Sequence, residues 1–174
     1  TRWYGRKGAA ISALGAVDVA LWDIRGKVAG EPVYRLLGAE RDRVRAYASA
    51  LLWKDDVEEL AEEARGYLGE GFRAVKMRLG RSWAYDLAAV QAVREAIGPD
   101  ARLMVDGSMR YDLSTAVRLA RELEALGACW FEEPFPPEEV DLFASLRPLV
   151  GVRIAAGENE FGVQGFREMI RAGA

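Results

Sequence analysis

Three short stretches of the chain share one pattern: LMVDGS (103–108), WFEEPF (130–135) and AAGENE (155–160). Each is a short apolar run that leads into an acid, namely Asp106, Glu132 or Glu158. Both intervals between these acids are 26 residues, enough for one strand, one loop and one helix of an α/β protein. The pattern therefore predicts three successive parallel strands, each with a carboxylate at the same end.

Alternating strand-like and helix-like segments extend this pattern over most of the chain. Expected strands cover 43–49, 72–79, 103–106, 129–132 and 152–156. Expected helices follow them, from Asp55 or Asp56 to Leu68, then over 84–97, 115–126 (capped by Ser114), 138–146 and 163–171. A helix over 9–28 precedes them; it is apolar around most of its circumference and is expected to be buried. A short helix at 33–37 follows it. Such an order predicts a parallel sheet covered by helices.

Two parallel folds compete, a doubly wound open sheet and a (β/α) TIM-type barrel. An open sheet usually has a glycine-rich phosphate turn after its first strand, but YASALLW (47–53) stands there. A barrel places its chemistry on the ends of several strands, as these acids would be placed. We therefore predict an incomplete barrel, with residues 1–42 as a helical segment leading into it and residues 43–174 as its first five βα units. Because a whole barrel takes about 250 residues, we expect the chain to be part of a longer protein.

The composition narrows the possible partners and the compartment. The net charge is −3 and there is no basic stripe, which argues against nucleic-acid binding. The early apolar segment is interrupted by Asp18, well short of the ~20 residues of a membrane span. The single cysteine, Cys129, cannot form an internal disulfide and suits a reducing, cytoplasmic location. The chain has no histidine, the commonest general base, so any catalytic reading must use other groups.

The three acids predict a site for a hard metal ion. Converging carboxylates repel one another unless a cation compensates their charge. An oxygen-only ligand set without cysteine or histidine favours Mg²⁺ over Zn²⁺. The alternative is that each acid is a solvated loop residue or a helix cap, although equal spacing in consecutive units is harder to explain in that way.

Two cations are expected beside these acids. In the strand 72–79, the alternation of side chains places Lys76 and Arg78 on the same face and near its end. They would face an anionic substrate held on the metal, or else form a solvated strand end. A metal and cations around a carboxylate stabilise the enediolate that forms when a base removes the α proton.

These motifs together resemble the enolase superfamily, in its mandelate racemase/muconate lactonizing enzyme branch. The opening GAAISALGAVDVALWDIRGKVAGEPVYRLLGA (8–39) resembles the helix and linker that lead into the barrel of that family. VKMRLG (75–80) resembles its Lys-x-Lys strand, and VDGS, FEEP and GEN resemble its metal-binding strand ends. The resemblance extends over essentially the whole chain.

The resemblance implies Mg²⁺ held by Asp106, Glu132 and Glu158, with Glu132 preferred to Glu133, which would be a supporting or loop residue. Lys76 would neutralise the substrate carboxylate, and Arg78 would stand at the position of a base. The family also implies an N-terminal capping domain before residue 1, late strands that often carry an Asp–His dyad, and a homo-oligomer.

Two positions depart from the family pattern. Arg78 replaces the second lysine, and a guanidinium stays protonated, so it is a poor base. Ser108 stands where the family often has asparagine. We therefore predict Mg²⁺-dependent abstraction of the proton α to a carboxylate through an enediolate, as an acid-sugar dehydratase, a lyase acting on a small carboxylate. The alternatives are a racemase or epimerase of a hydroxy or amino acid, and a non-catalytic barrel serving as a binding or assembly subunit.

Overall fold

The structure is a computed structural model that describes residue 5 and residues 7–174, so the first part of the predicted segment 1–42 lies outside it. The chain divides into two compact units. One comprises Thr1–Arg45 with Glu160–Phe166, and the other comprises Ala46–Asn159 with Arg167–Ala174. The second unit carries the sheet and the candidate site.

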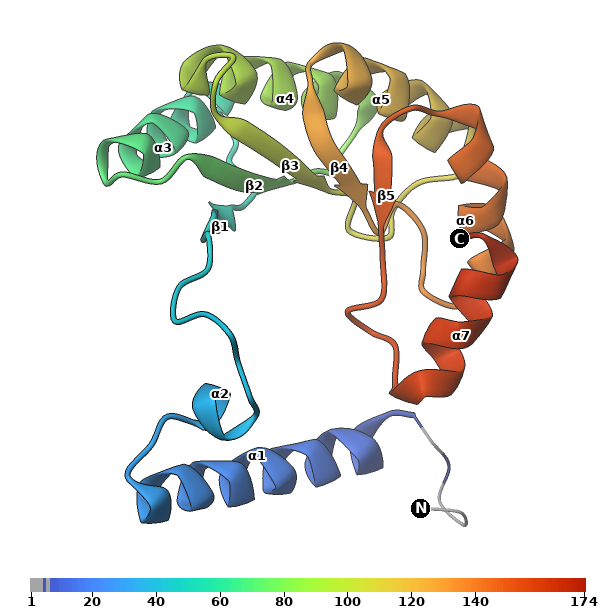
Figure 1. Ribbon diagram of the computed structural model, residues 1–174. Coiled ribbons are helices and arrows are strands. Elements are labelled where there is room, and N and C mark those ends of the chain that lie inside the picture. Colours follow the sequence, from blue (N-terminus) through green and yellow to red (C-terminus); the bar gives the residue numbers. More distant parts are fainter. Residues whose placement is uncertain (1–4, 6) are drawn as a thin grey trace. The chain divides into compact units, whose positions relative to one another are not determined.

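Five parallel strands form one sheet, and they lie side by side in the order of the sequence (Figure 1). They are β1 (Ala48–Leu51), β2 (Ala74–Arg78), β3 (Arg102–Asp106), β4 (Ala128–Glu132) and β5 (Arg153–Ala155). A doubly wound sheet reverses its strand order at a switch point, whereas this order never reverses. The fold is therefore part of a (β/α) TIM-type barrel, as predicted.

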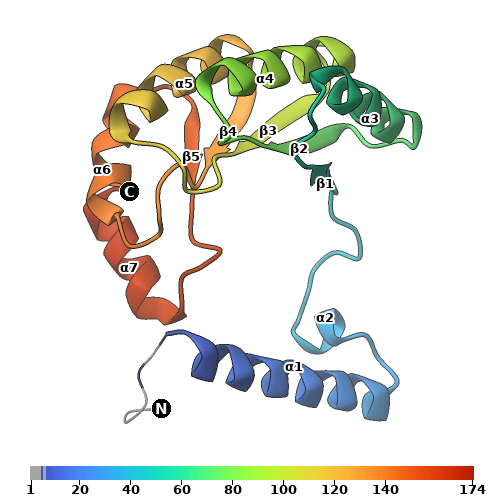
Figure 2. The same cartoon turned by 180° about the vertical axis from the view of Figure 1, so that it is seen from behind.

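Helices connect the strands and cover one side of the sheet (Figures 1 and 2). They are α3 (Val57–Gly69), α4 (Trp83–Ile97), α5 (Leu113–Ala125) and α6 (Val140–Leu146). A 3-10 turn, Arg147–Leu149, follows α6, and the last helix, α7 (Gly162–Ala172), follows β5. Their apolar residues pack on the strand residues that point outward, such as Val75 and Met77 of β2. Lys76 and Arg78 alternate with Val75 and Met77 along β2, so their side chains lie on the opposite face of the sheet, as the two-residue period of a strand predicts.

The helix starts show which side chain caps each helix. Asp56 caps α3 by accepting a hydrogen bond from the Glu58 backbone N–H (2.9 Å), which decides between the two aspartates expected there. The predicted Ser114 cap of α5 is wrong. Asp112 caps that helix instead, because its backbone is extended and its carboxylate accepts from the Thr115 N–H (2.8 Å). Ser114 lies inside the first turn and donates its hydroxyl to Asp112 (2.7 Å).

The first strand begins later than predicted, at Ala48 instead of residue 43. Its pairing with β2 gives the reason. Ala48 pairs with Val75 and Leu51 with Met77, so residues 43–46 would extend beyond Ala74, where β2 begins. An alternating pattern alone cannot mark where the neighbouring strand starts.

The first unit contains α1 (Ala9–Ala29) and α2 (Val33–Leu36). Both helices were predicted, but the expected burial of α1 is wrong for the part of the chain that is described. Only Gly26 of α1 is buried, and six of its apolar side chains are more than half exposed: Leu14, Val17, Val19, Leu21, Ile24 and Val28. The segment that follows α1 contacts it at Gly26, whose carbonyl oxygen accepts from the Glu31 N–H (3.1 Å), and this contact covers only the C-terminal end of the helix. In the described residues, no helix is both long and apolar enough to cross a membrane.

Candidate functional site

The carboxyl ends of three neighbouring strands bring the candidate residues into one row. Arg78 of β2 is in register with Asp106 of β3, and Asp106 is in register with Glu132 of β4. Lys76 lies two residues before Arg78 and on the same face of β2. Because the register of a parallel sheet fixes which side chains are neighbours, this row is a direct consequence of the strand pairing.

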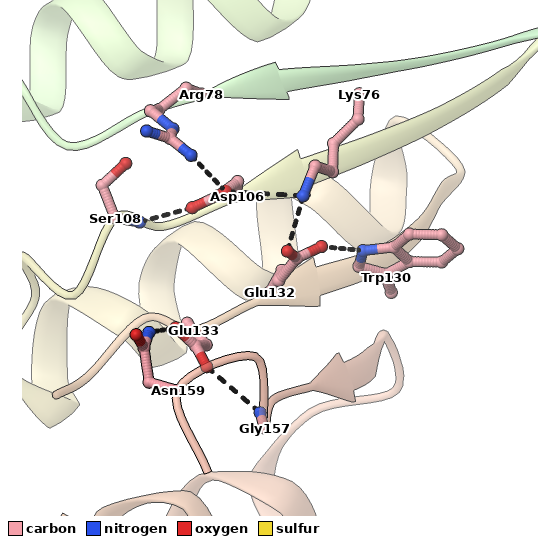
Figure 3. A network of polar contacts seen from close by, with 9 residues as sticks. All are labelled: Lys76, Arg78, Asp106, Ser108, Trp130, Glu132, Glu133, Gly157 and Asn159. Atoms are coloured by element: carbon pink, nitrogen blue, oxygen red, sulfur yellow. Dashed lines mark hydrogen bonds and ion pairs between the residues drawn. The ribbon is translucent and has the colours of Figure 1, made fainter. Parts of the chain in front are cut away.

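The two cations bind the two acids of this row (Figure 3). Lys76 Nζ lies 2.5 Å from Glu132 Oε1 and 3.5 Å from Asp106 Oδ2, and so it bridges β3 and β4. Arg78 Nη2 donates to Asp106 Oδ2 at 3.1 Å. The side chains of Lys76 and Asp106 are only 11% and 6% exposed, whereas that of Arg78 is 42% exposed. Lys76 is therefore an enclosed part of the site, and Arg78 forms its open side.

The acids keep Lys76 in its charged form. Partial burial on its own lowers the pKa of the Lys76 ammonium. The hydrogen bond and charge of Glu132, together with the charge of Asp106, outweigh that effect and raise the pKa above its usual value. The site therefore contains a fixed positive charge against two carboxylates.

Neutral donors orient the remaining oxygens of both acids. Trp130 Nε1 donates to Glu132 Oε2 (2.8 Å), and the Trp130 ring meets Tyr47 edge to face at 5.8 Å. The Ser108 backbone N–H donates to Asp106 Oδ1 (2.8 Å). Sequence reasoning missed Trp130, although its position two residues before Glu132 on one strand face could have revealed it.

Ser108 is an unusual member of the site. Its backbone is left-handed, with φ of 54°, which is uncommon for a residue other than glycine. Its hydroxyl oxygen is buried and has no hydrogen-bond partner among the described residues. A buried, unsatisfied hydroxyl beside the acid row is available to a bound polar ligand.

Among the described residues, Glu158 forms no hydrogen bond or ion pair with the side chains of this row. It lies in the turn between β5 and α7, and its side chain is exposed. In the described part of the chain, no group of three or more acidic, histidine or cysteine residues is placed to hold a metal ion. The structure thus brings together Lys76, Arg78, Asp106 and Glu132, and the role of Glu158 as a third metal ligand stays a prediction.

The acids that are gathered suit a hard cation. Asp106 and Glu132 come from adjacent strands and converge on one positively charged group, the Lys76 ammonium. Their donor atoms are all carboxylate oxygens, which Mg²⁺ prefers and which softer metals do not. The residues therefore fit Mg²⁺, and the ligand set Asp106, Glu132 and Glu158 stays a prediction.

Comparison with known proteins gives the family. A family model described as "Enolase C-terminal domain-like" matches residues 59–174. The chain belongs to the mandelate racemase/muconate lactonizing enzyme family of the enolase superfamily. A model of the N-terminal domain of that family matches residues 3–38. These residues lie within the segment 1–42 that was predicted to lead into the barrel. The family resemblance seen in the sequence is confirmed.

Relatives in this family include a cycloisomerase and a dehydratase. The chain is 39% identical to D-galactarolactone cycloisomerase of Agrobacterium fabrum and 38% identical to arabinonate dehydratase of Saccharolobus solfataricus. These matches cover 98% and 97% of the chain but 46% of each relative, so the chain spans about half of their length. The crystal structure of a racemase from Streptomyces coelicolor with bound magnesium superposes with a TM-score of 0.92 at 38% identity, over 99% of this chain and 52% of that one.

Proposed function

We propose that the whole protein removes the proton α to the carboxylate of a small acid through an enediolate, with Mg²⁺, and that the net reaction is dehydration of an acid sugar. The observation that carries the proposal is the pair of carboxylates, Asp106 and Glu132, brought together by neighbouring strands around Lys76. The arabinonate dehydratase among the relatives supports the choice of an acid sugar.

The residues of the chain take separate roles in this proposal. Asp106 and Glu132, joined by Glu158, would hold Mg²⁺, which when bound supplies positive charge that stabilises a carboxylate gaining negative charge. Lys76, whose pKa the two acids raise, would bind the carboxylate of the substrate as a cation. Arg78 is half exposed and permanently charged, so it binds or orients an anion at the open side of the site.

The proton acceptor is not Arg78, because a guanidinium does not deprotonate in a protein. The chain has no histidine to take this role. We therefore assign the base to a part of the whole protein outside these residues. A single base suits β-elimination, in which C2 loses its proton, C3 loses hydroxide, and the resulting enol becomes a 2-keto acid.

The test is to incubate the full-length protein and Mg²⁺ with a panel of acid sugars and to measure 2-keto acid. We expect product from at least one sugar acid, loss of product after chelation of Mg²⁺, and no product from the Glu132→Gln variant. Absence of 2-keto acid from every sugar acid, together with racemisation of a hydroxy or amino acid, would overturn the proposal.

Racemisation or epimerisation is the second candidate, and the similarity to the S. coelicolor racemase favours it. In D₂O, that activity exchanges the α proton without loss of water, whereas dehydration gives a deuterated keto acid. A lactone substrate belongs in the same panel, because one relative is a lactone cycloisomerase.

A non-catalytic barrel is the third candidate, and Arg78 and Ser108, which depart from the family pattern, favour it. Metal titration of Asp106→Ala separates this candidate from the others. A non-catalytic barrel predicts that Asp106→Ala no longer binds Mg²⁺ and that neither this variant nor the unaltered protein turns over any substrate.

A further inference from the structure

The turn after β5 is held at two points by a single side chain, Glu133. Glu133 Oε1 accepts a hydrogen bond from the Gly157 backbone N–H at 3.1 Å. Its other oxygen, Oε2, accepts from Asn159 Nδ2 at 3.2 Å. Gly157 and Asn159 are the residues directly before and after Glu158, so one carboxylate binds the turn on both sides of that residue (Figure 3).

Glu133 is itself fixed in place by its backbone. Its N–H donates to the Ala155 carbonyl at the end of β5 (2.9 Å), and its carbonyl accepts from the Met109 N–H in the loop after β3 (2.8 Å). Its φ of 36° is left-handed, and so the chain leaves the extended conformation directly after Glu132. A rigid backbone thus carries the side chain that holds the turn.

The chemistry of this contact requires an acid. Glu133 is 2% exposed, and among the described residues no lysine or arginine forms an ion pair with it. Both of its oxygens are satisfied by neutral N–H groups, which is what makes a buried carboxylate tolerable. A glutamine in the same place would offer one acceptor oxygen instead of two.

We infer that Glu133 is a positioning residue for Glu158: it fixes the turn 157–159 so that Glu158 is presented to the metal. The inference rests on the proposed function, because that proposal makes Glu158 a metal ligand. A purely structural role would affect stability and leave metal affinity unchanged. A positioning role changes metal affinity, because the groups that orient a ligand set its affinity by about 10–100-fold.

The test measures Mn²⁺ affinity of the full-length protein by electron paramagnetic resonance, without substrate. Asn159→Asp places two carboxylates in contact and separates the turn from Glu133, and we expect Mn²⁺ binding to weaken by about 10-fold or more. The added negative charge alone would strengthen cation binding, so the expected direction is opposite to that of a simple charge effect. Unchanged or stronger binding in Asn159→Asp would overturn the inference.

A compensating pair gives the matched control. In Glu133→Gln/Asn159→Asp, the glutamine amide donates to the new carboxylate and its oxygen accepts from Gly157, while the net charge equals that of the unaltered protein. We expect Mn²⁺ affinity to return to within about 3-fold of the original value, well inside the range of an orienting group. Failure of the pair to recover affinity, when it folds with an unchanged melting temperature, would count against the inference.

Two further variants keep the test decisive. If Asn159→Asp does not fold, Asn159→Ala removes one hydrogen bond without adding charge, and its Mn²⁺ affinity should still fall; an unchanged value would overturn the inference.

Glu158→Gln separates this inference from the proposed function. Unchanged Mn²⁺ binding in Glu158→Gln removes Glu158 from the proposed ligand set. Weaker binding there, with no change in Asn159→Asp, leaves the ligand set standing and refutes only the role of Glu133.

Discussion

Asp106 and Glu132, at the ends of β3 and β4, are held in a different way from Glu133, the acid directly after β4. Asp106 and Glu132 each accept from one neutral N–H group, and each also pairs with a cation, Lys76 or Arg78. Glu133 holds the turn after β5, and its carboxylate accepts from two neutral groups, the Gly157 backbone N–H and the Asn159 side-chain amide. Acids bound by cations can exchange one positive charge for another, whereas acids bound by neutral donors hold the chain in position.

The same distinction extends to other acids of the second unit. Asp86 is 1% exposed and accepts from the backbone N–H groups of Gly80 (3.0 Å) and Arg81 (3.1 Å), and from the Tyr111 hydroxyl (2.8 Å). It thereby joins the loops that follow β2 and β3. We therefore expect substitutions among the cation-bound acids to change chemistry directly. Substitutions among the donor-bound acids should change stability, and they should change metal affinity only where the segment that they hold carries a proposed ligand, as with Glu133.

Glu132→Gln gives the largest expected effect. The amide keeps the shape but loses the charge that pairs with Lys76, so we expect kcat to fall by more than about 100-fold and Mg²⁺ affinity to fall with it. Circular dichroism should show a retained fold. Glu138→Gln, which removes an exposed acid six residues away, is the control and should leave both quantities unchanged. Full activity in Glu132→Gln would remove this residue from the metal set.

Lys76→Met should give the next largest effect. It removes the cation that both acids share, and we expect kcat/KM to fall by about 100-fold, because the substrate carboxylate loses its charged partner. The melting temperature without metal should also fall, and added Mg²⁺ should restore part of it by supplying positive charge to the same acids. Unchanged kcat and KM would show that Lys76 has no part in the reaction.

Tyr111→Phe tests the other side of the comparison. The hydroxyl that it removes donates to the buried Asp86, and a hydrogen bond to a charged group contributes about 1.5–3 kcal/mol to stability. Burial, together with the hydrogen bond and charge of Asp86, raises the pKa of Tyr111 well above its usual range, so the phenol remains a donor. Urea denaturation should show a loss of that size, with kcat nearly unchanged.

Tyr67→Phe is the matched control for this experiment, because the Tyr67 hydroxyl donates to the partly exposed Glu63 at 3.0 Å. Its effect on the free energy of unfolding should be smaller. If Tyr111→Phe instead abolishes turnover without loss of stability, Asp86 does not have a structural role, and the distinction fails.

The row of charges could be predicted from the sequence because it depends on two simple periods. The strand period of two placed Lys76 and Arg78 on one face, and the repeat of 26 residues placed Asp106 and Glu132 at the same strand ends. The order of strands, and hence the barrel, follows from the same repeat. Each of these features depends on neighbours within one strand or one βα unit.

The remaining features depend on groups that no local pattern identifies. The role of Glu133 requires a left-handed residue and donors 24 and 26 residues further along the chain. The start of β1 depends on where β2 begins, and the exposure of α1 depends on which residues cover it. An apolar helix surface indicates that a partner is needed, but it does not identify the partner.

The smallest expected effect concerns Asp112, a donor-bound acid that caps α5 and has no role in the acid row. Hydrogen bonds from the Ser114 hydroxyl and from the N–H and hydroxyl of Thr115 lower the pKa of Asp112 below its usual 3.8. Because the folded pKa is the lower one, the contribution to stability is complete above about pH 3.8 and is lost as the pH falls through the folded pKa. Asp112→Asn keeps a capping side chain that does not titrate.

The unaltered protein should therefore lose stability relative to Asp112→Asn as the pH falls below about 3.8, and the two should run parallel at neutral pH. Melting temperatures across that range measure the difference. Asp141→Asn is the control, since this exposed acid lies in the first turn of α6 without capping it. Parallel curves for Asp112→Asn at every pH would show that its neutral donors do not favour the charged form. The description of donor-bound acids would then hold only for the buried ones, Asp86 and Glu133.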